Sequence, residues 1–216
     1  MLRWINDIPR NAVMNMSLDE FLFNEYKNEP VLRTYCWDNA YTTIGYFQKS
    51  GCGHSFIRRL TGGLTVQHHY DISYSFIISS DFWNVYSQRQ TYRNIHLLIQ
   101  KTLQNININS VILDKNAGNA TNVCVQSFYE NDLLSEGKKI VGSCLRRRAN
   151  KIIAQGSIHA RLNDNNKTIF SRNFAVNTAE FLKTDIKTLG FSNSEIESAE
   201  KIAKEKYSNP KWNDKF

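Results

Sequence analysis

The pattern of an antiparallel hairpin runs through residues 122–158, NVCVQSFYENDLLSEGKKIVGSCLRRRANKIIAQGSI. Two short strand-like runs, 132–135 and 138–143, flank Glu136-Gly137, and glycine supplies the positive φ that a tight two-residue turn needs. A further strand is predicted over residues 152–162. We therefore expect a sheet that holds the lysines after Gly137 in a fixed position.

Outward from this stretch, the N-terminal half mixes helical and strand patterns. Residues 15–29 predict an amphipathic helix that is capped by Asn15 or Ser17. Residues 31–37 predict a strand, and the alternation over residues 72–78 predicts a strand that is buried on one face only.

The remaining segments complete the expected order. Residues 85–106 predict a helix and residues 111–113 a strand, while 116–122 (NAGNATN) is turn-rich and predicts a loop. Residues 194–207 predict a charged helix with Ser194 as its cap. This order, with helices and strands in no regular alternation, predicts the α+β class.

Length and composition fit one globular domain over residues 1–216, because 41% of the residues are hydrophobic and 22% are charged. No apolar run approaches the roughly 20 residues that cross a bilayer, so no membrane association is expected. The N-terminus MLRWINDIPR lacks the apolar core of a secretory signal, and a cytoplasmic location is therefore expected.

The charge and the cysteines narrow the possible partners. A net charge of +7 predicts an anionic partner and leaves nucleic acid, an anionic cofactor and an acidic protein open. No C-x-x-C pair occurs, which argues against a zinc ribbon or a redox motif. Free thiols are expected at all four cysteines: Cys36, Cys52, Cys124 and Cys144.

A second motif, RRLTGG, opens the stretch 58–76. Adjacent Gly62 and Gly63 permit unusual φ values or the close approach of a ligand to the main chain, and guanidinium neighbours suit a carboxylate, phosphate or carbonyl oxygen. An ordinary turn with two surface arginines is the alternative. His68 and His69 point to opposite faces of a strand, so we expect one to pack and one to line a site, with no metal bound.

The lysine motif GKKIVGS, residues 137–143, together with RRLTGG, resembles the family of lipoate-protein ligases, octanoyltransferases and related biotin ligases. The resemblance covers nearly the whole chain. It includes, in order, MNMSLDE (14–20), RTYCW (33–37), TIGYFQ (43–48), RRLTGG (58–63), GKKIVGS (137–143), AQGSI (154–158) and a closing KYxxxKWN (206–213). It implies a mixed β-sheet flanked by helices.

The resemblance also implies roles for residues. Lys139 matches the lysine that contacts the acyl carbonyl, and the loop from Arg58 and Arg59 to His68 matches the segment that wraps the acyl chain. Further substrate-binding residues are implied at Thr61, Gly62, Gly63, Leu64, Gly142, Ser143, Gln155, Gly156 and Ser157.

Cys124 favours a transferase, because its spacing of 15 residues before Lys139 resembles that of the cysteine-dependent octanoyltransferases. A thiolate takes an acyl group from a carrier thioester and yields it to an amine without any cofactor. In a straight hairpin, however, Lys139 faces Leu134, roughly 33 Å of strand away from Cys124. Residues 124–130 must bend back for the pair to work; otherwise Cys124 is a small buried side chain.

An ATP-dependent lipoate-protein ligase is the alternative, and it requires Mg-ATP and lipoate. Asn131-Asp132 resembles the pair before the ligase lysine, whereas Leu64 stands where ligases carry a third glycine. His69 replaces a usual aspartate, and Gln155 replaces a usual histidine. An accessory domain on another chain remains open for this alternative.

The arginine run Arg146-Arg147-Arg148 admits two readings. One interpretation is a nucleic-acid-binding module, which the sequence favours least because aromatic residues are not interleaved with the basic ones. The other is a rim that, with Arg58, faces an acidic partner. The expected partners are an acyl carrier protein as donor and a lipoyl-domain acceptor, such as a 2-oxoacid dehydrogenase E2 component or glycine cleavage H protein.

Overall fold

The computed structural model describes residues 1–50, 56–83, 87–115 and 123–216, and it contains the predicted hairpin. Strands β8 (Leu133–Ser135) and β9 (Lys138–Arg148) meet at a turn in which Glu136 and Gly137 have φ values of 50° and 73°. Strand β10 (Lys151–Ile158) pairs antiparallel with β9. β9 continues past its predicted end at residue 143, while β10 stops before residue 162.

These strands belong to an eight-stranded sheet. The strands β11, β1 and β2 run parallel, and the remaining neighbours are antiparallel, so the sheet is mixed as the resemblance implied. The strand order is β11 (Ile186–Thr188), β1 (Leu2–Asn6), β2 (Val31–Tyr35), β6 (Ile72–Ser79), β10, β9, β8 and β7 (Val111–Ile112).

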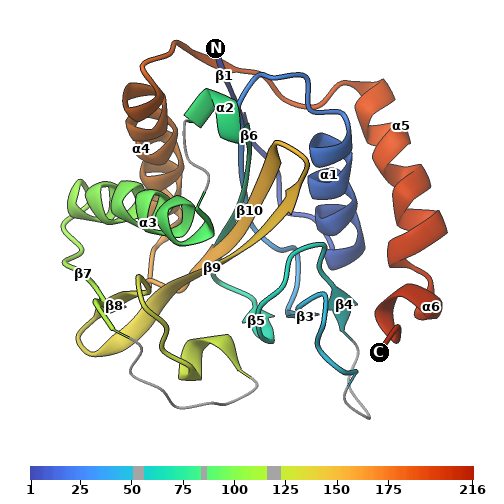
Figure 1. Cartoon of the computed structure of the whole chain (residues 1–216), viewed down its shortest axis with the longest axis horizontal. Coiled ribbons are helices and arrows are strands. Elements are labelled where there is room, and N and C mark those ends of the chain that lie inside the picture. The colour runs from blue at the N-terminus through green and yellow to red at the C-terminus, as the bar shows by residue number, and fades with distance from the viewer. Residues whose placement is uncertain (51–55, 84–86, 116–122) are drawn as a thin grey trace.

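Helices cover both faces of this sheet (Figure 1). α3 (Gln88–Gln104) and α4 (Asp164–Leu182) lie on one face, and α1 (Ala12–Asn24) and α5 (Asn193–Ile202) lie on the other. The chain also contains the short helices α2 (Ser80–Trp83) and α6 (Pro210–Asn213) and a π-helical turn at Ala203–Tyr207. Among the described residues, no helix combines the length and apolarity needed to cross a membrane.

Strand β6 is buried on both faces, and the prediction of a half-buried strand is wrong. Its residues Ile72, Tyr74, Phe76 and Ile78 join the core cluster beneath α3 and α4. The serines on the opposite face are buried because their hydroxyls have partners there: Ser75 Oγ, for example, donates to Asp19 Oδ1 of α1 at 2.7 Å. Because their hydroxyls are hydrogen-bonded, the serines can be buried, although a strand face rich in serine is typically exposed.

The helix ends differ from the predictions. Asn11 caps α1 by accepting from Met14 N, whereas Asn15 and Ser17 are buried inside the helix. Ser192 caps α5 in a reciprocal capping box with Glu195, so Ser194 is not the cap. The sequence pattern missed α4, because polar residues surround the few apolar ones that pack beneath it: Phe170, Phe174 and Ala175.

A second, three-stranded sheet carries the RRLTGG segment. β3 (Tyr41–Ile44) lies in its middle, parallel to β4 (Ile57–Arg58) and antiparallel to β5 (Val66–His68). The loop between β4 and β5 is thereby held against the large sheet. The predicted loop at 116–122, residue 85 and Cys52 lie outside the described residues.

Candidate active site

Lys139 is a buried lysine on β9, next to the hairpin turn. It faces Leu134 across the hairpin, as predicted, and a register shift between Leu133 and Leu134 distorts the pairing there. Its Nζ forms an ion pair with Asp132 Oδ2 at 2.7 Å and donates to Ser127 O at 3.1 Å. Burial lowers the pKa of Lys139, but its interactions with Cys124 and Asp132 outweigh burial and raise the pKa overall, so the side chain is an ammonium at neutral pH.

Cys124 reaches Lys139 because the chain before the hairpin bends back. Val123 forms a parallel bridge with Thr65, Cys124 N donates to Thr65 O at 2.8 Å, and a 3₁₀ turn begins at Cys124. The thiol then lies beside the Lys139 side chain, because both approach the same point at Gly142. The condition that residues 124–130 must bend back is therefore met.

Gly142 is the point on β9 where both side chains meet. A Cβ at this position would lie 2.9 Å from Lys139 Cε, 3.2 Å from Lys139 Nζ and 3.0 Å from Cys124 Sγ. Because any side chain here would displace one of them, glycine is required for the pair to form. The arrangement places the Cys124 thiol beside a buried ammonium.

Arg58 occupies a different place from the one expected. It is fully buried, and its guanidinium donates to the carbonyl oxygens of Gly45, Tyr46, Gln48, Trp212 and Asn213 at 2.6–3.2 Å. The prediction that Arg58 faces an anionic partner is therefore wrong. A buried guanidinium satisfies several main-chain acceptors at once, so Arg58 joins the small sheet to the C-terminal segment.

Arg59 fixes the conformation of the loop between β4 and β5, residues 59–65, which we call the glycine loop. Its guanidinium donates to Gly62 O at 3.0 Å, Leu64 O at 2.8 Å and Thr43 Oγ1 at 2.8 Å. Gly63 has a φ of 86°, and a Cβ there would lie 2.0 Å from Cys144 Sγ. The loop thus approaches β9 closely because it has no side chain at this position.

His68 belongs to a buried polar cluster. Its Nδ1 lies 2.8 Å from Asp71 Oδ2, and its Nε2 lies 2.8 Å from Thr43 Oγ1. Burial lowers the pKa of His68, and its ring stacks on Trp37 with the centroids 4.1 Å apart. Both ring nitrogens are engaged, so His68 is not a base for Cys124. His69 is exposed, in keeping with opposite orientations of the two histidines.

The residues of the AQGSI motif lie on β10 and connect the site to neighbouring elements. Gln155 accepts from Thr61 Oγ1 at 2.8 Å and donates to Asp19 Oδ2 at 2.7 Å, which links the glycine loop to α1. Gly156 makes room for the ring of Tyr74, only 2.4 Å from where its Cβ would be.

Ser143 points away from the site, and its predicted role in substrate binding is wrong. Its hydroxyl lies 2.5 Å from Tyr74 Oη and 2.7 Å from His96 Nε2, on the side of the sheet that faces α3. Successive residues of a strand face opposite sides, so Gly142 and Cys144 face the site while Ser143 cannot.

The same alternation divides the arginine run. Arg146 donates to Leu60 O at 3.0 Å and covers the ring of Tyr46, whereas Arg147 bonds Ser80 of α2. Arg148 is exposed. The three arginines therefore do not form one rim.

A narrow cavity of about 30 Å³ lies between the glycine loop, β2 and β10. It has room for no more than about one water molecule. Sequence reasoning missed several of its walls, including Met16, Tyr35 and Trp37, although these lie within motifs that carry the family resemblance. Its lining residues are Met16, Tyr35, Trp37, Arg59, Val66, His68, Ser73, Cys124, Gly142, Cys144, Gln155, Gly156 and Ser157.

Two acidic residues have roles in the site that the sequence does not indicate. Asp71 accepts hydrogen bonds from His68, Ser73 and Ser157, and Asp132 pairs with Lys139. An acid just before a strand, as Asp71 is, gives no sequence signal of such a role. In the sequence, Asp132 stands out only by its resemblance to the ligase pair.

The chain belongs to the lipoyl protein ligase A/B catalytic domain family, whose model matches residues 11–194. This confirms the resemblance and, with it, the expected α+β fold. The fold is shared with lipoate-protein ligase A bound with ATP, at a TM-score of 0.80 and 19% identity, over 98% of this chain and 97% of that one. Protein Ta0514 of T. acidophilum with bound lipoic acid also has a TM-score of 0.80, at 20% identity over 99% of each chain.

Among sequence relatives, octanoyltransferase LipM of Brevibacillus brevis is 32% identical over 178 residues. That match covers 72% of this chain but only 64% of the relative, which is less than two thirds of its length. The match to octanoyltransferase LipM of Bacillus cereus is 25% identical and covers 97% of this chain and 96% of the relative.

Proposed function

We propose that the protein is an acyltransferase that attaches an octanoyl or lipoyl group to a lysine of a lipoyl-domain protein through a thioester on Cys124. The observation that carries this proposal is the meeting of Cys124 and Lys139 over Gly142. A thiol held against a buried ammonium is an arrangement for nucleophilic chemistry rather than for packing. The relatives named octanoyltransferase LipM support the same reaction.

In the first step, the Cys124 sulfur attacks the carbonyl carbon of the donor thioester. The new carbon–sulfur bond forms, the bond to the donor sulfur breaks, and the donor leaves as a thiol with the proton that Cys124 gives up, while the acyl group remains on Cys124. The Lys139 ammonium stabilises the attacking thiolate and then the negative oxygen of the tetrahedral intermediate. Asp132 and Ser127 O hold Lys139 in place for both tasks.

The acyl chain would occupy the cavity beside Cys124. Arg59 and Val66, on either side of the glycines, form one wall, and Gln155, Gly156 and Ser157 of β10 form another. Gly62, Gly63 and Leu64 do not line the cavity in its narrow form, and their contact with the acyl chain stays a prediction. At about 30 Å³ the cavity is narrower than an eight-carbon chain, so binding must widen it. The large sheet is a rigid wall of paired strands, and we therefore expect the glycine loop to move.

A lipoate-protein ligase is the second candidate, favoured by the shared fold and by Asp132 beside Lys139. An adenylate phosphate in this cavity would need cations. Arg59 is engaged by loop carbonyls and Lys139 by Asp132, so both of these cations already have partners. The thioester route needs no cofactor, whereas the ligase route needs Mg-ATP and lipoate.

The acyl carrier protein as donor, and an E2 component or H protein as acceptor, remain predictions. So does the organisation of residues 1–216 as one domain.

The test is intact mass of the protein after incubation with octanoyl-carrier protein, without ATP. We expect a hydroxylamine-labile octanoyl adduct on the parent protein and none on Cys124→Ala. Cys144→Ala is the matched control, because burial raises the pKa of that thiol and keeps it protonated; it should still form the adduct. If no adduct forms, but lipoate with Mg-ATP yields a bound acyl-adenylate, the protein is a ligase.

A further inference from the structure

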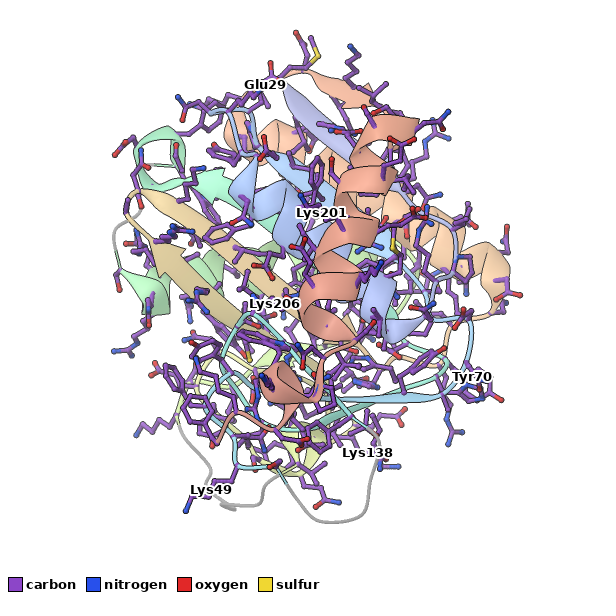
Figure 2. The ribbon with its side chains drawn as sticks, turned by 90° about the vertical axis from the view of Figure 1, so that its right-hand side faces the viewer. Glu29, Lys49, Tyr70, Lys138, Lys201 and Lys206 are labelled. Atoms are coloured by element: carbon purple, nitrogen blue, oxygen red, sulfur yellow. The ribbon has the colours of Figure 1, made fainter. Side chains whose placement is uncertain are left out.

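An open cleft of about 1000 Å³ adjoins the narrow cavity. Three segments line it: residues 40–42 at β3, 67–71 after β5, and 159–163 between β10 and α4. Tyr70 on its edge is 74% exposed, and Figure 2 shows this residue at the surface. A cleft of this size is large enough for a small molecule or for a side chain of a partner.

Only one layer of side chains separates this cleft from the narrow cavity. His68 lines both. Ser157 lines the narrow cavity, and its hydroxyl donates to Asp71 Oδ2 at 2.5 Å and lies 3.0 Å from Nε2 of His159, which lines the cleft. The two spaces therefore share a wall of His68, Asp71, Ser157 and His159, which we call the polar wall.

The polar wall also borders the reacting pair. Ser157 is paired with Gly142 across β10 and β9, and Gly142 is the residue against which Cys124 and Lys139 lie. His159 N donates to Ile140 O at 2.7 Å, one residue from Lys139. The polar wall therefore stands between the cleft and the reacting pair.

The charge of the polar wall suits a cation. Although burial raises the pKa of Asp71, hydrogen bonds from His68 and Ser157 hold it below its ordinary value, so this carboxyl is ionised. Burial lowers the pKa of both His68 and His159, which are therefore neutral at neutral pH. The four wall residues together carry the one negative charge of Asp71. The cations Arg59 and Lys139 act on the wall's histidines from the side of the narrow cavity, and Arg161 lies exposed among the residues that line the cleft.

The hydrogen bonds also define the proton positions on His159. An ionised carboxylate only accepts, so the hydroxyl proton of Ser157 goes to Asp71. Ser157 Oγ must then accept from His159 Nε2, which carries the proton. Nδ1 of His159 is therefore unprotonated and is able to accept one.

We propose that this cleft receives the acceptor protein and leads its lysine to Cys124, with His159 taking the first proton; this rests on the proposed function. The lysine ammonium gives one proton to His159 Nδ1. The neutral amine attacks the thioester carbonyl, the carbon–nitrogen bond forms, and the carbon–sulfur bond breaks. The second proton passes from nitrogen to the Cys124 sulfur as the amide leaves. His159 then releases the first proton to solvent, which restores the free enzyme.

The experiment measures transfer from enzyme that is already loaded with octanoate to an unmodified recombinant lipoyl domain, followed by intact mass. Gln67 lines the cleft and is exposed, so either a positive or a negative charge can be introduced at this position. Gln67→Lys should slow transfer about tenfold by repelling the ammonium, while the nearly isosteric Gln67→Glu should not slow it. His159→Gln, which lacks the proton acceptor, should slow transfer about a hundredfold.

Aromatic contact is tested in the same assay. Tyr70→Ala should slow transfer, whereas Phe82→Ala, which removes an exposed aromatic ring from α2 outside the cleft, should not. Cleavage of the thioester by hydroxylamine, a neutral nucleophile, should be the same in the parent and in both Gln67 variants.

The outcomes separate the two proposals. A parent protein that never forms the thioester refutes the proposed function and the role of the cleft with it. Normal loading, with equal transfer rates for Gln67→Lys, Gln67→Glu and the parent, refutes the role of the cleft alone. Slow transfer by Gln67→Lys that is matched by slow hydroxylamine cleavage also refutes it, because the variant then damages the thioester site itself.

Discussion

Gly142 controls the distance between the two proposed reacting groups by having no side chain. The atoms that a Cβ would meet, Lys139 Cε at 2.9 Å and Cys124 Sγ at 3.0 Å, are at the ends of side chains rather than on the backbone. They can move aside at small cost to folding. At this position, therefore, stability and chemistry should respond differently to one added methyl group.

We expect Gly142→Ala to lower the rate of thioester formation about a hundredfold, because a misplacement of about 1 Å has effects of that size. The melting temperature should change little. The measurement is the octanoyl loading rate by intact mass, alongside thermal unfolding. Gly190→Ala is the control, since a Cβ there meets nothing within 4 Å. Unchanged loading by Gly142→Ala would contradict the role of this contact.

At the scale of elements, α3 braces the strand that carries Lys139. His96 of α3 bonds Asn131 O through Nδ1 at 2.6 Å and Ser143 Oγ through Nε2 at 2.7 Å. Tyr92, one turn earlier, donates to Asp132 and accepts from Ser143 N. The helix thereby holds both the strand β9 and the acid that pairs with Lys139.

Burial lowers the pKa of His96 to about 3, which makes the contact between α3 and β9 sensitive to acid. The unfolded chain binds a proton at this histidine below about pH 6.5, while the folded protein does not. Acid therefore favours unfolding, and stability should fall as the pH decreases from 6.5 towards 3.

Urea unfolding of the parent and of His96→Gln tests this sign. Between pH 7 and pH 5, the free energy of unfolding of the parent relative to the variant should fall by about 2 kcal/mol. Subtracting the variant removes the effect of the other histidines. A difference that stays constant with pH would show that His96 is not the titrating group.

At the scale of the whole molecule, Arg58 connects parts of the chain that are far apart in sequence. Its guanidinium bonds carbonyls near Gly45 and others near Asn213, and the Asn213 side chain accepts from Arg58 N at 3.0 Å. The small sheet, which carries the glycine loop, is attached to the C-terminal segment in this way.

Arg58→Met should lower the free energy of unfolding by more than about 3 kcal/mol, because several buried carbonyls lose their hydrogen-bond donor. Urea unfolding measures this loss. Arg161→Met, which replaces an exposed arginine, should stay within about 0.5 kcal/mol of the parent. If both variants unfold alike, the Arg58 bonds contribute nothing to stability.

Local patterns in the sequence determined the hairpin at Gly137, the helices α1, α3 and α5, and, by resemblance, the family. Turn chemistry and apolar periodicity are carried by neighbouring residues, so they can be read without the fold. The cap of α1 and the whole of α4 escaped the same reasoning, because their signals compete with nearby polar residues.

Only the tertiary structure decided which side chains meet. It bends residues 124–130 so that Cys124 reaches Lys139, buries Arg58 among carbonyls, turns Ser143 towards α3, and places His159 beside the cleft. Each of these depends on contacts between residues far apart in the chain, such as Val123 with Thr65 and Ser157 with Asp71. Such contacts form only when the sheet and its loops assemble, and no short stretch of sequence encodes them alone.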